Sequence, residues 1–287
     1  MEPRLSVSQI TTFRSSFADD VRAYAAAGLD GIGIWELKLA AGGDSAALEI
    51  LEQSGLERAS AVPDVPSILP LPLLGGPTDP NERIDAYCRS LERLAPFEPS
   101  AVVLLTGAGD RDIAVEGLRT IAAEAERLGL RIALEPYQRD GGEQWSVIHS
   151  LPETIELIED AGEPASVGIQ FDVWHLWNTP TLFDDIAEHV DRFAGVHVCD
   201  RREPTRGWAD RALPGDGTAD VPAILRALDA AGWDGLYDIE IFSDDGTFGA
   251  PYDDSYWAAP PEETLARAMD AFERCWSLTP QEVEEHR

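Results

Sequence analysis

The chain has few lysines, few cysteines and no long apolar run, and each shortage argues against a class of protein. Its 22 basic residues stand against 53 acidic ones, which gives a formal net charge of −31. Such a charge repels phosphate backbones and anionic membrane surfaces, so we expect no nucleic acid and no membrane as partner. Three scattered cysteines indicate neither a disulfide framework nor a cysteine-ligated zinc site.

The distribution of apolar residues also predicts no targeting segment and no membrane-spanning segment. No run of 18 or more apolar residues is found, and the first residues lack the apolar segment of a signal peptide. We therefore expect a cytoplasmic protein with a solvated acidic surface. Lys38 is the single lysine and follows an apolar segment, residues 30–36. This isolation makes it a candidate for contact with a substrate oxygen.

Apolar runs of strand length alternate with amphipathic helical stretches along the whole chain. Strict alternation predicts parallel strands joined by right-handed crossovers, and 287 residues suit eight such units. An open doubly wound sheet is the alternative, but the turn after its first strand would be rich in glycine, and residues 8–17 contain none. The sequence therefore predicts an α/β fold, a single (β/α)8 barrel domain over residues 1–287. The predicted strands are 4–9, 30–36, 57–63, 101–107, 131–136, 167–174, 193–199 and 236–242, and the predicted helices include 112–129, 221–233 and 261–276.

Polar side chains interrupt the apolar pattern in four consecutive predicted strands. Alternate side chains of a barrel strand point into the barrel, and the apolar alternation of these strands leaves one strong ligand facing inward in each. Each ligand lies near the carboxyl end of its strand, where barrel enzymes carry their active sites. The four residues are Glu135, Asp172, His197 and Glu240.

Three buried carboxylates at one place would cost several kcal/mol through desolvation and mutual repulsion. Protonation or pairing with arginine would remove this cost, and so would a divalent cation. Three oxygen ligands and one imidazole suit Mn²⁺, Mg²⁺, Co²⁺ or Zn²⁺, so we favour a metal site. His175 lies just past the strand that carries Asp172. We expect a loop to turn it over the mouth, toward a substrate oxygen rather than the metal.

With these residues in place, the sequence resembles the sugar phosphate isomerase/epimerase superfamily of xylose isomerase-like barrels. This family includes ketose 3-epimerases, inosose dehydratases and endonuclease IV. The resemblance covers essentially the whole chain and is strongest in ALEPYQR, FDVWHLW, GVHVCDRR, LPGDGTAD and GLYDIEIF. It implies one divalent ion, Mn²⁺ before Mg²⁺, Co²⁺ or Zn²⁺, bound by Glu135, Asp172, His197 and Glu240. It also implies that Glu135 and Glu240 act as an acid/base pair.

The same resemblance implies contacts between protein and substrate. His175 would bind a substrate oxygen, and an arginine after the histidine strand would take part. Four arginines of residues 200–217 qualify, and the sequence does not fix the register among them. We select Arg202 and Arg206, and Arg201 and Arg211 remain open.

These features predict a metal-dependent isomerase or epimerase that acts on a sugar, cyclitol or related keto-polyol through an enediolate. A dehydratase or lyase on the same scaffold is the alternative, because elimination starts from the same proton removal. An endonuclease IV-like phosphodiesterase would need more than five histidines and a basic groove. A non-catalytic sugar-binding barrel would leave the four ligands unexplained. The expected partner is a small sugar or polyol, and homo-oligomer formation stays open.

Overall fold

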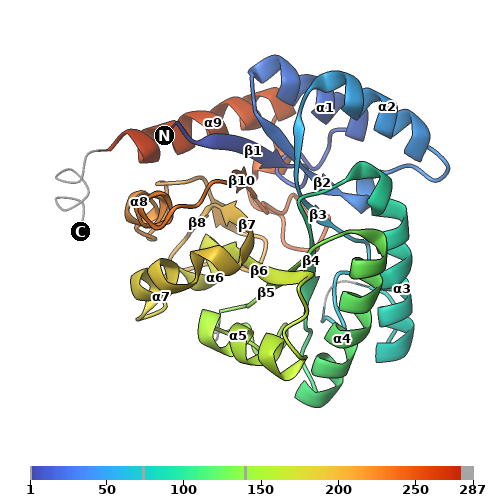
Figure 1. The fold of residues 1–287 in the computed structure, drawn as a ribbon. Coiled ribbons are helices and arrows are strands. Elements are labelled where there is room, and N and C mark those ends of the chain that lie inside the picture. The colour runs from blue at the N-terminus through green and yellow to red at the C-terminus, as the bar shows by residue number, and fades with distance from the viewer. Residues whose placement is uncertain (1, 73–74, 139–140, 279–287) are drawn as a thin grey trace.

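The computed structural model describes residues 2–72, 75–138 and 141–278 and contains a closed barrel of eight parallel strands (Figure 1). The strands pair in the order β1-β10-β7-β6-β5-β4-β3-β2, and β2 closes the barrel by pairing with β1. This confirms the predicted (β/α)8 barrel, with every strand within three residues of its expected bounds. The strands are β1 (Arg4–Ser8), β2 (Gly31–Trp35), β3 (Glu57–Val62), β4 (Ala101–Leu105), β5 (Ile132–Glu135), β6 (Val167–Asp172), β7 (Phe193–Val198) and β10 (Leu236–Ile239).

Helices surround the barrel and cover the outer faces of its strands (Figure 1). Many begin at a side chain that accepts a hydrogen bond from the first turn, such as Ser16, Asp110 and Ser150. Among the described residues no helix is long and apolar enough to cross a membrane. The helices are α1 (Phe17–Ala27), α2 (Asp44–Ser54), α3 (Pro80–Leu94), α4 (Arg111–Leu128), α5 (Leu151–Asp160), α6 (Val173–Leu176), α7 (Leu182–His189), α8 (Val221–Ala231) and α9 (Pro261–Ser277), with 3₁₀ segments η1 (Glu36–Lys38), η2 (Ala95–Phe97), η3 (Val190–Arg192) and η4 (Tyr256–Ala258).

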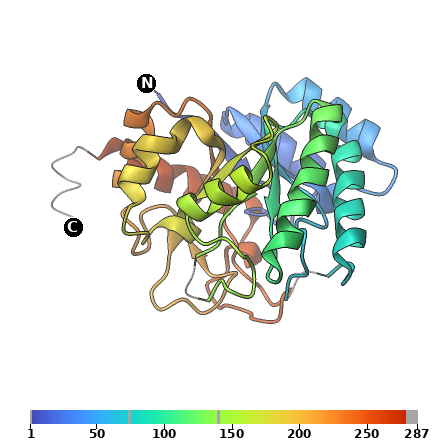
Figure 2. The same cartoon turned by 60° about the horizontal axis from the view of Figure 1, so that its bottom comes forward.

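The long connections gather at one end of the barrel, at the bottom of Figure 2, where the strands have their carboxyl ends. The main core lies between the strands and the helices and includes Tyr24, Tyr87, Phe97 and Phe171. Because the helices fill the outer faces of the strands, the inward side chains and the long connections are left to form a site.

The segment after β6 differs from the sequence prediction. The strand ends at Asp172 rather than at residue 174, and α6 begins immediately. The Asp172 carboxylate accepts a hydrogen bond of 2.7 Å from the backbone N–H of Trp174, which starts the helix. His175 therefore lies in a helical turn and is buried, instead of standing in a loop over the mouth.

A small hairpin between β7 and α8 is absent from the predicted elements. Its strands, β8 (Asp200–Arg201) and β9 (Arg211–Ala212), pair antiparallel, so that Arg201 lies opposite Arg211. The buried Asp200 carboxylate fixes the connection that follows, because it accepts hydrogen bonds of 2.7–3.0 Å from four backbone N–H groups. The donors are Arg201, Gly215, Gly217 and Ala219.

Gly107, just after β4, provides a test of how tightly the loops are packed at this end. Its φ is +73°, and a Cβ there would lie 2.2 Å from the carbonyl oxygen of Leu69. We expect Gly107→Ala to lower the free energy of unfolding by about 1–2 kcal/mol for the left-handed backbone and about 1–3 kcal/mol more for the overlap. Urea denaturation of both proteins measures the difference.

Gly55→Ala is the matched control, since Gly55 has a φ of +76° and no atom within 4 Å of the added Cβ. It should show the backbone cost of about 1–2 kcal/mol alone. Equal losses in the two variants would contradict the tight contact with Leu69.

Candidate metal centre and active-site cavity

The four predicted ligands meet at the carboxyl end of the barrel. Glu135 ends β5, Asp172 ends β6, His197 lies in β7, and Glu240 directly follows β10. One ligand atom each from Glu135, Asp172 and His197 lies within 4.8 Å of the other two. The Glu240 Oε2 atom lies 3.3 Å from His197 Nδ1, and all four side chains are buried. Because each of four strands carries one inward-facing ligand near its carboxyl end, the four side chains form one cluster.

Arg211 reaches into this cluster from β9. Its Nη1 atom donates to Asp172 Oδ2 at 2.8 Å and to Glu240 Oε2 at 3.0 Å. Burial opposes the charge of this guanidinium, but the carboxylates outweigh burial and raise the pKa of Arg211 well above its usual value. The arginine pairing considered from the sequence is therefore present for two of the three carboxylates.

Two donor atoms of the cluster have no hydrogen-bond partner among the described residues. They are Glu135 Oε1 and His197 Nδ1, and they lie 3.7 Å apart. Burial raises the pKa of Glu135 to about 7. Buried polar atoms without partners are rare in proteins, and these two point toward one another. A set of carboxylate oxygens and one imidazole nitrogen fits a divalent cation at this place.

The other ring nitrogen of His197, Nε2, faces polar groups inside the barrel. The Nε2 atom lies 2.9 Å from Ser60 Oγ and 3.8 Å from Asp238 Oδ2, and Ser6 donates to the other Asp238 oxygen. Gly33 makes room for Asp238, because a Cβ at residue 33 would lie 2.2 Å from Asp238 Oδ2. These groups turn the Nδ1 atom of His197 toward the carboxylates.

His175 lies beside the cluster rather than in its centre. Its Nε2 atom is 3.8 Å from Asp172 Oδ2, and its ring lies 3.7 Å from the ring of Tyr137, measured between centroids. Burial, together with the charges of Arg211 and Arg201, lowers the pKa of His175 well below its usual value, so the imidazole is neutral. Its expected contact with a substrate oxygen stays a prediction.

The other three residues that were expected to contact the substrate form ion pairs outside the cluster. Lys38 Nζ donates to Asp20 Oδ2 at 2.6 Å, in a buried pair. Arg202 and Arg206 both pair with Asp210, which is buried in the connection between β8 and β9. These ammonium and guanidinium groups are thus already bound, and Arg211 is the basic residue that joins the ligands.

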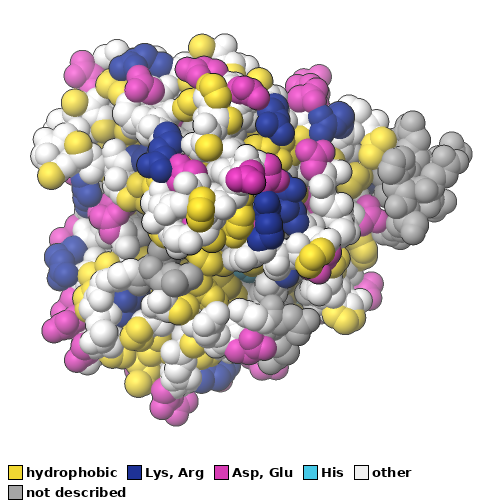
Figure 3. All heavy atoms as spheres, turned by 180° about the vertical axis from the view of Figure 1, so that it is seen from behind, with side chains coloured by type: hydrophobic (Ala, Val, Ile, Leu, Met, Phe, Trp, Pro, Cys, Tyr) yellow, Lys and Arg dark blue, Asp and Glu magenta, His cyan; other side chains and the backbone are white. Residues whose placement is uncertain are grey.

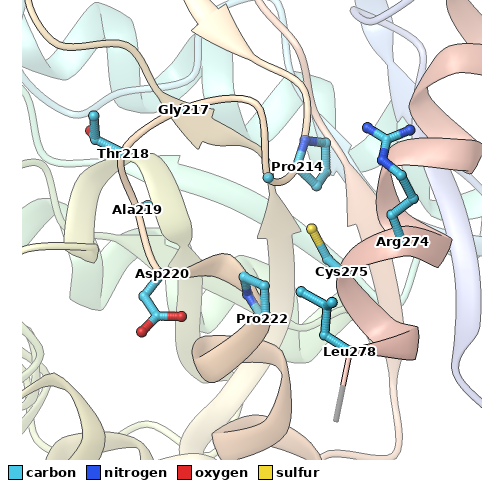
Figure 4. Close-up of a pocket in the computed structure, with 10 residues that line it drawn as sticks. Pro214, Gly217, Thr218, Ala219, Asp220, Pro222, Arg274, Cys275 and Leu278 are labelled. Carbon is cyan, nitrogen blue, oxygen red and sulfur yellow. The ribbon is translucent and has the colours of Figure 1, made fainter. Parts of the chain in front are cut away.

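A cavity of about 50 Å³ lies over the cluster, and Glu135, His197, Arg211 and Glu240 line one side of it. Its other described walls are aromatic and aliphatic. Figure 3 shows hydrophobic side chains gathered in a hollow at the middle of the face seen there. A larger cavity of about 620 Å³ lies between residues 214–222 and α9, and Figure 4 shows Arg274 and Cys275 facing it. None of the four ligands lines this second cavity.

Comparison with known proteins agrees with the fold. Residues 21–276 match the family model described as xylose isomerase-like TIM barrel. An inosose dehydratase of Geobacillus thermodenitrificans is 25% identical over 148 residues, which are 46% of this chain and 47% of that protein. The matched region thus spans about half the length of this curated relative.

Two solved structures resemble the chain over nearly its full length. Protein SMc04130 from Sinorhizobium meliloti 1021 is 26% identical, with a TM-score of 0.82, covering 95% of this chain and 98% of that one. The IOLI protein, whose structure holds a zinc atom, is 18% identical, with a TM-score of 0.76, covering 96% and 98%. The second likeness is one of fold.

The ion pairs of Arg211 can be tested by stability measurements. In metal-free protein, Arg211→Met should lower the free energy of unfolding by about 3–5 kcal/mol, because it leaves buried carboxylates uncompensated. Arg22→Met is the control, since Arg22 and its partner Asp19 are both 63% exposed and their ion pair should contribute little to stability. Guanidinium denaturation compares the two variants, and equal losses would contradict a central role for Arg211.

Proposed function

Because the chain belongs to the xylose isomerase-like TIM barrel family, we propose that it is a metal-dependent isomerase or epimerase of a sugar, cyclitol or related keto-polyol. The observation that carries this proposal is the buried ligand cluster, in which Glu135 Oε1 and His197 Nδ1 face each other without hydrogen-bond partners among the described residues. A divalent ion bound between them would satisfy both atoms. The cluster also lies at the end of the barrel where this fold places its chemistry.

The residues that would hold the cation are Glu135, Asp172, His197 and Glu240. Mn²⁺ is our first choice, with Mg²⁺, Co²⁺ and Zn²⁺ as alternatives, and the zinc atom of the IOLI protein supports a divalent ion. Bound there, the ion would stabilise the negative charge that develops on a carbonyl oxygen when a neighbouring proton leaves.

Proton transfer falls to the two glutamates. They reach the cluster from β5 and β10, which β6 and β7 separate in the barrel order. One carboxylate can therefore remove a proton from the carbon beside the carbonyl, and the other can return a proton from another direction. Arg211 holds Glu240 and Asp172 in place, so the orientation of Glu240 depends on this ion pair.

Elimination is the second candidate, and the inosose dehydratase relative supports it. Its first step is the same removal of a proton beside a carbonyl by Glu135 or Glu240. A hydroxyl or alkoxy group then leaves the next carbon, and a carboxylic acid supplies its proton. Release of water or of an aglycone would identify this reaction.

The acid/base assignment is tested by Glu135→Gln and Glu240→Gln. An amide oxygen still coordinates a metal but does not readily take a proton. We expect each variant to keep much of its metal and to lose on the order of 10²–10⁴ in turnover. Elemental analysis gives the metal content, and NMR in D₂O follows proton exchange on a panel of ketoses and inososes. Near-normal turnover in both variants would refute the acid/base roles and leave the metal site standing.

The support of His197 from inside the barrel gives a test that does not depend on turnover. Asp238→Asn keeps the size of the side chain but removes the carboxylate beside His197 Nε2. We expect metal affinity to fall by about 10–100-fold, the usual effect of losing the group behind a histidine ligand. Competition with a fluorescent chelator measures this, and Asp216→Asn, which pairs with Arg274 near the molecular surface, is the control. Unchanged affinity in Asp238→Asn would show that Asp238 does not support the ligand.

A further inference from the structure

The cavity over the cluster offers a substrate few polar groups beyond the cluster itself. Apart from Glu135, His197, Arg211 and Glu240, its described lining has no charged, amide, serine or threonine side chain. Six aromatic residues instead make up much of the wall. They are Trp35, Tyr137, Trp145, Trp208, Phe242 and Phe248.

These aromatic side chains touch one another and form a continuous surface. Tyr137 and Trp145 stack with ring centroids 5.9 Å apart, and Trp145 contacts Trp208 at 5.5 Å. Trp208 in turn contacts Phe242 at 5.5 Å and Phe248 at 5.0 Å. The surface thus links the connection after β5, the hairpin connection and the segment after β10. We call this set, together with Trp35, the aromatic wall.

The polar atoms of the aromatic wall are one hydroxyl, that of Tyr137, and the three indole N–H groups of Trp35, Trp145 and Trp208. The indole N–H of Trp35 already donates to Ser8 Oγ at 2.9 Å. A hydroxyl buried without a partner costs about 1–3 kcal/mol, so substrate hydroxyls that reach neither the cluster nor these groups would lower the affinity. Ligand pockets orient polar molecules through a few well-placed polar groups, and in this cavity those groups belong to the cluster.

We propose that the substrate is a hydroxyketone that carries an aromatic group, with its oxygens at the cluster and its aromatic group against the aromatic wall. This inference rests on the proposed function and narrows its keto-polyol to one that carries an aromatic group. Aromatic groups gain about 0.5–1.5 kcal/mol per ring contact beyond the area they bury. The wall offers such contacts on several sides of the cavity.

The aromatic rings that line the cavity leave little free volume in it. About 50 Å³ is too little for a phenyl ring, since a cavity that holds benzene measures roughly 150 Å³. Trp208 and Phe248 are only partly buried and pack against each other at the mouth. On this proposal, the two rings swing outward when the aromatic group of the substrate binds.

Two small hydroxyketones test the substrate class. In 2-hydroxyacetophenone a phenyl group flanks the carbonyl, and in hydroxyacetone a methyl group does; D-fructose serves as the polyol. Mn²⁺-loaded protein is titrated with each while tryptophan fluorescence is recorded, and NMR in D₂O follows exchange of the protons beside the carbonyl. We expect 2-hydroxyacetophenone to bind at least about tenfold more tightly than either other ketone, which corresponds to one or two ring contacts.

Variants of Trp208 connect this preference to the aromatic wall. Trp208→Phe keeps a ring and should keep the preference, whereas Trp208→Gln should reduce it to less than about threefold, since one ring contact is lost. Equal or tighter binding of D-fructose, or an unchanged preference in Trp208→Gln, would overturn the inference. Exchange of D-fructose protons without a phenyl preference would support the proposed function alone. Tight binding of 2-hydroxyacetophenone without exchange of any ketone would support the aromatic wall and refute the function.

Discussion

The ion pairs of Arg211 with Asp172 and Glu240 are the interaction on which the site depends. Two carboxylates buried at the ends of nearby strands repel each other and lose their hydration, and the arginine offsets both costs. A guanidinium stays charged at any physiological pH, so this compensation does not depend on a bound cation. Glu135 has no such arginine partner, and its Oε1 atom makes no hydrogen bond among the described residues.

The position of Arg211 depends in turn on the hairpin outside the barrel. Arg211 belongs to β9, which pairs with β8, and the Asp200 carboxylate holds the following connection through backbone N–H groups. The guanidinium also lies over the ring of Phe242, 4.7 Å from its centroid. This hairpin, which follows no regular pattern in the sequence, therefore determines where the Arg211 guanidinium lies. A shift of the hairpin would move that charge away from the carboxylates.

The residues that sequence reasoning found and missed differ in what fixes their positions. Alternation along a strand is a property of the backbone, so apolar periodicity alone placed Glu135 and His197 inside the barrel. No such rule applies to the hairpin, where four arginines lie within residues 201–211, so the sequence left Arg211 open and did not show that it joins the ligands. The ion pair of Lys38 with a residue of α1 arises only from tertiary packing, so the isolation of this lysine in the sequence did not reveal its partner.

At the barrel mouth the strands, though not the longer connections, fall into two chemically different groups, although all eight are equivalent in topology. The ligands come from β5, β6, β7 and the end of β10, which are neighbours in the closed sheet. The strands across from them, β2, β3 and β4, contribute Trp35, Val62, Val103 and Leu105 to the cavity. A molecule whose oxygens face the ligands must therefore point its remaining atoms toward these apolar side chains. This division limits the ways in which a substrate can enter, because turning it around would bury its oxygens without partners and place its apolar end against charges.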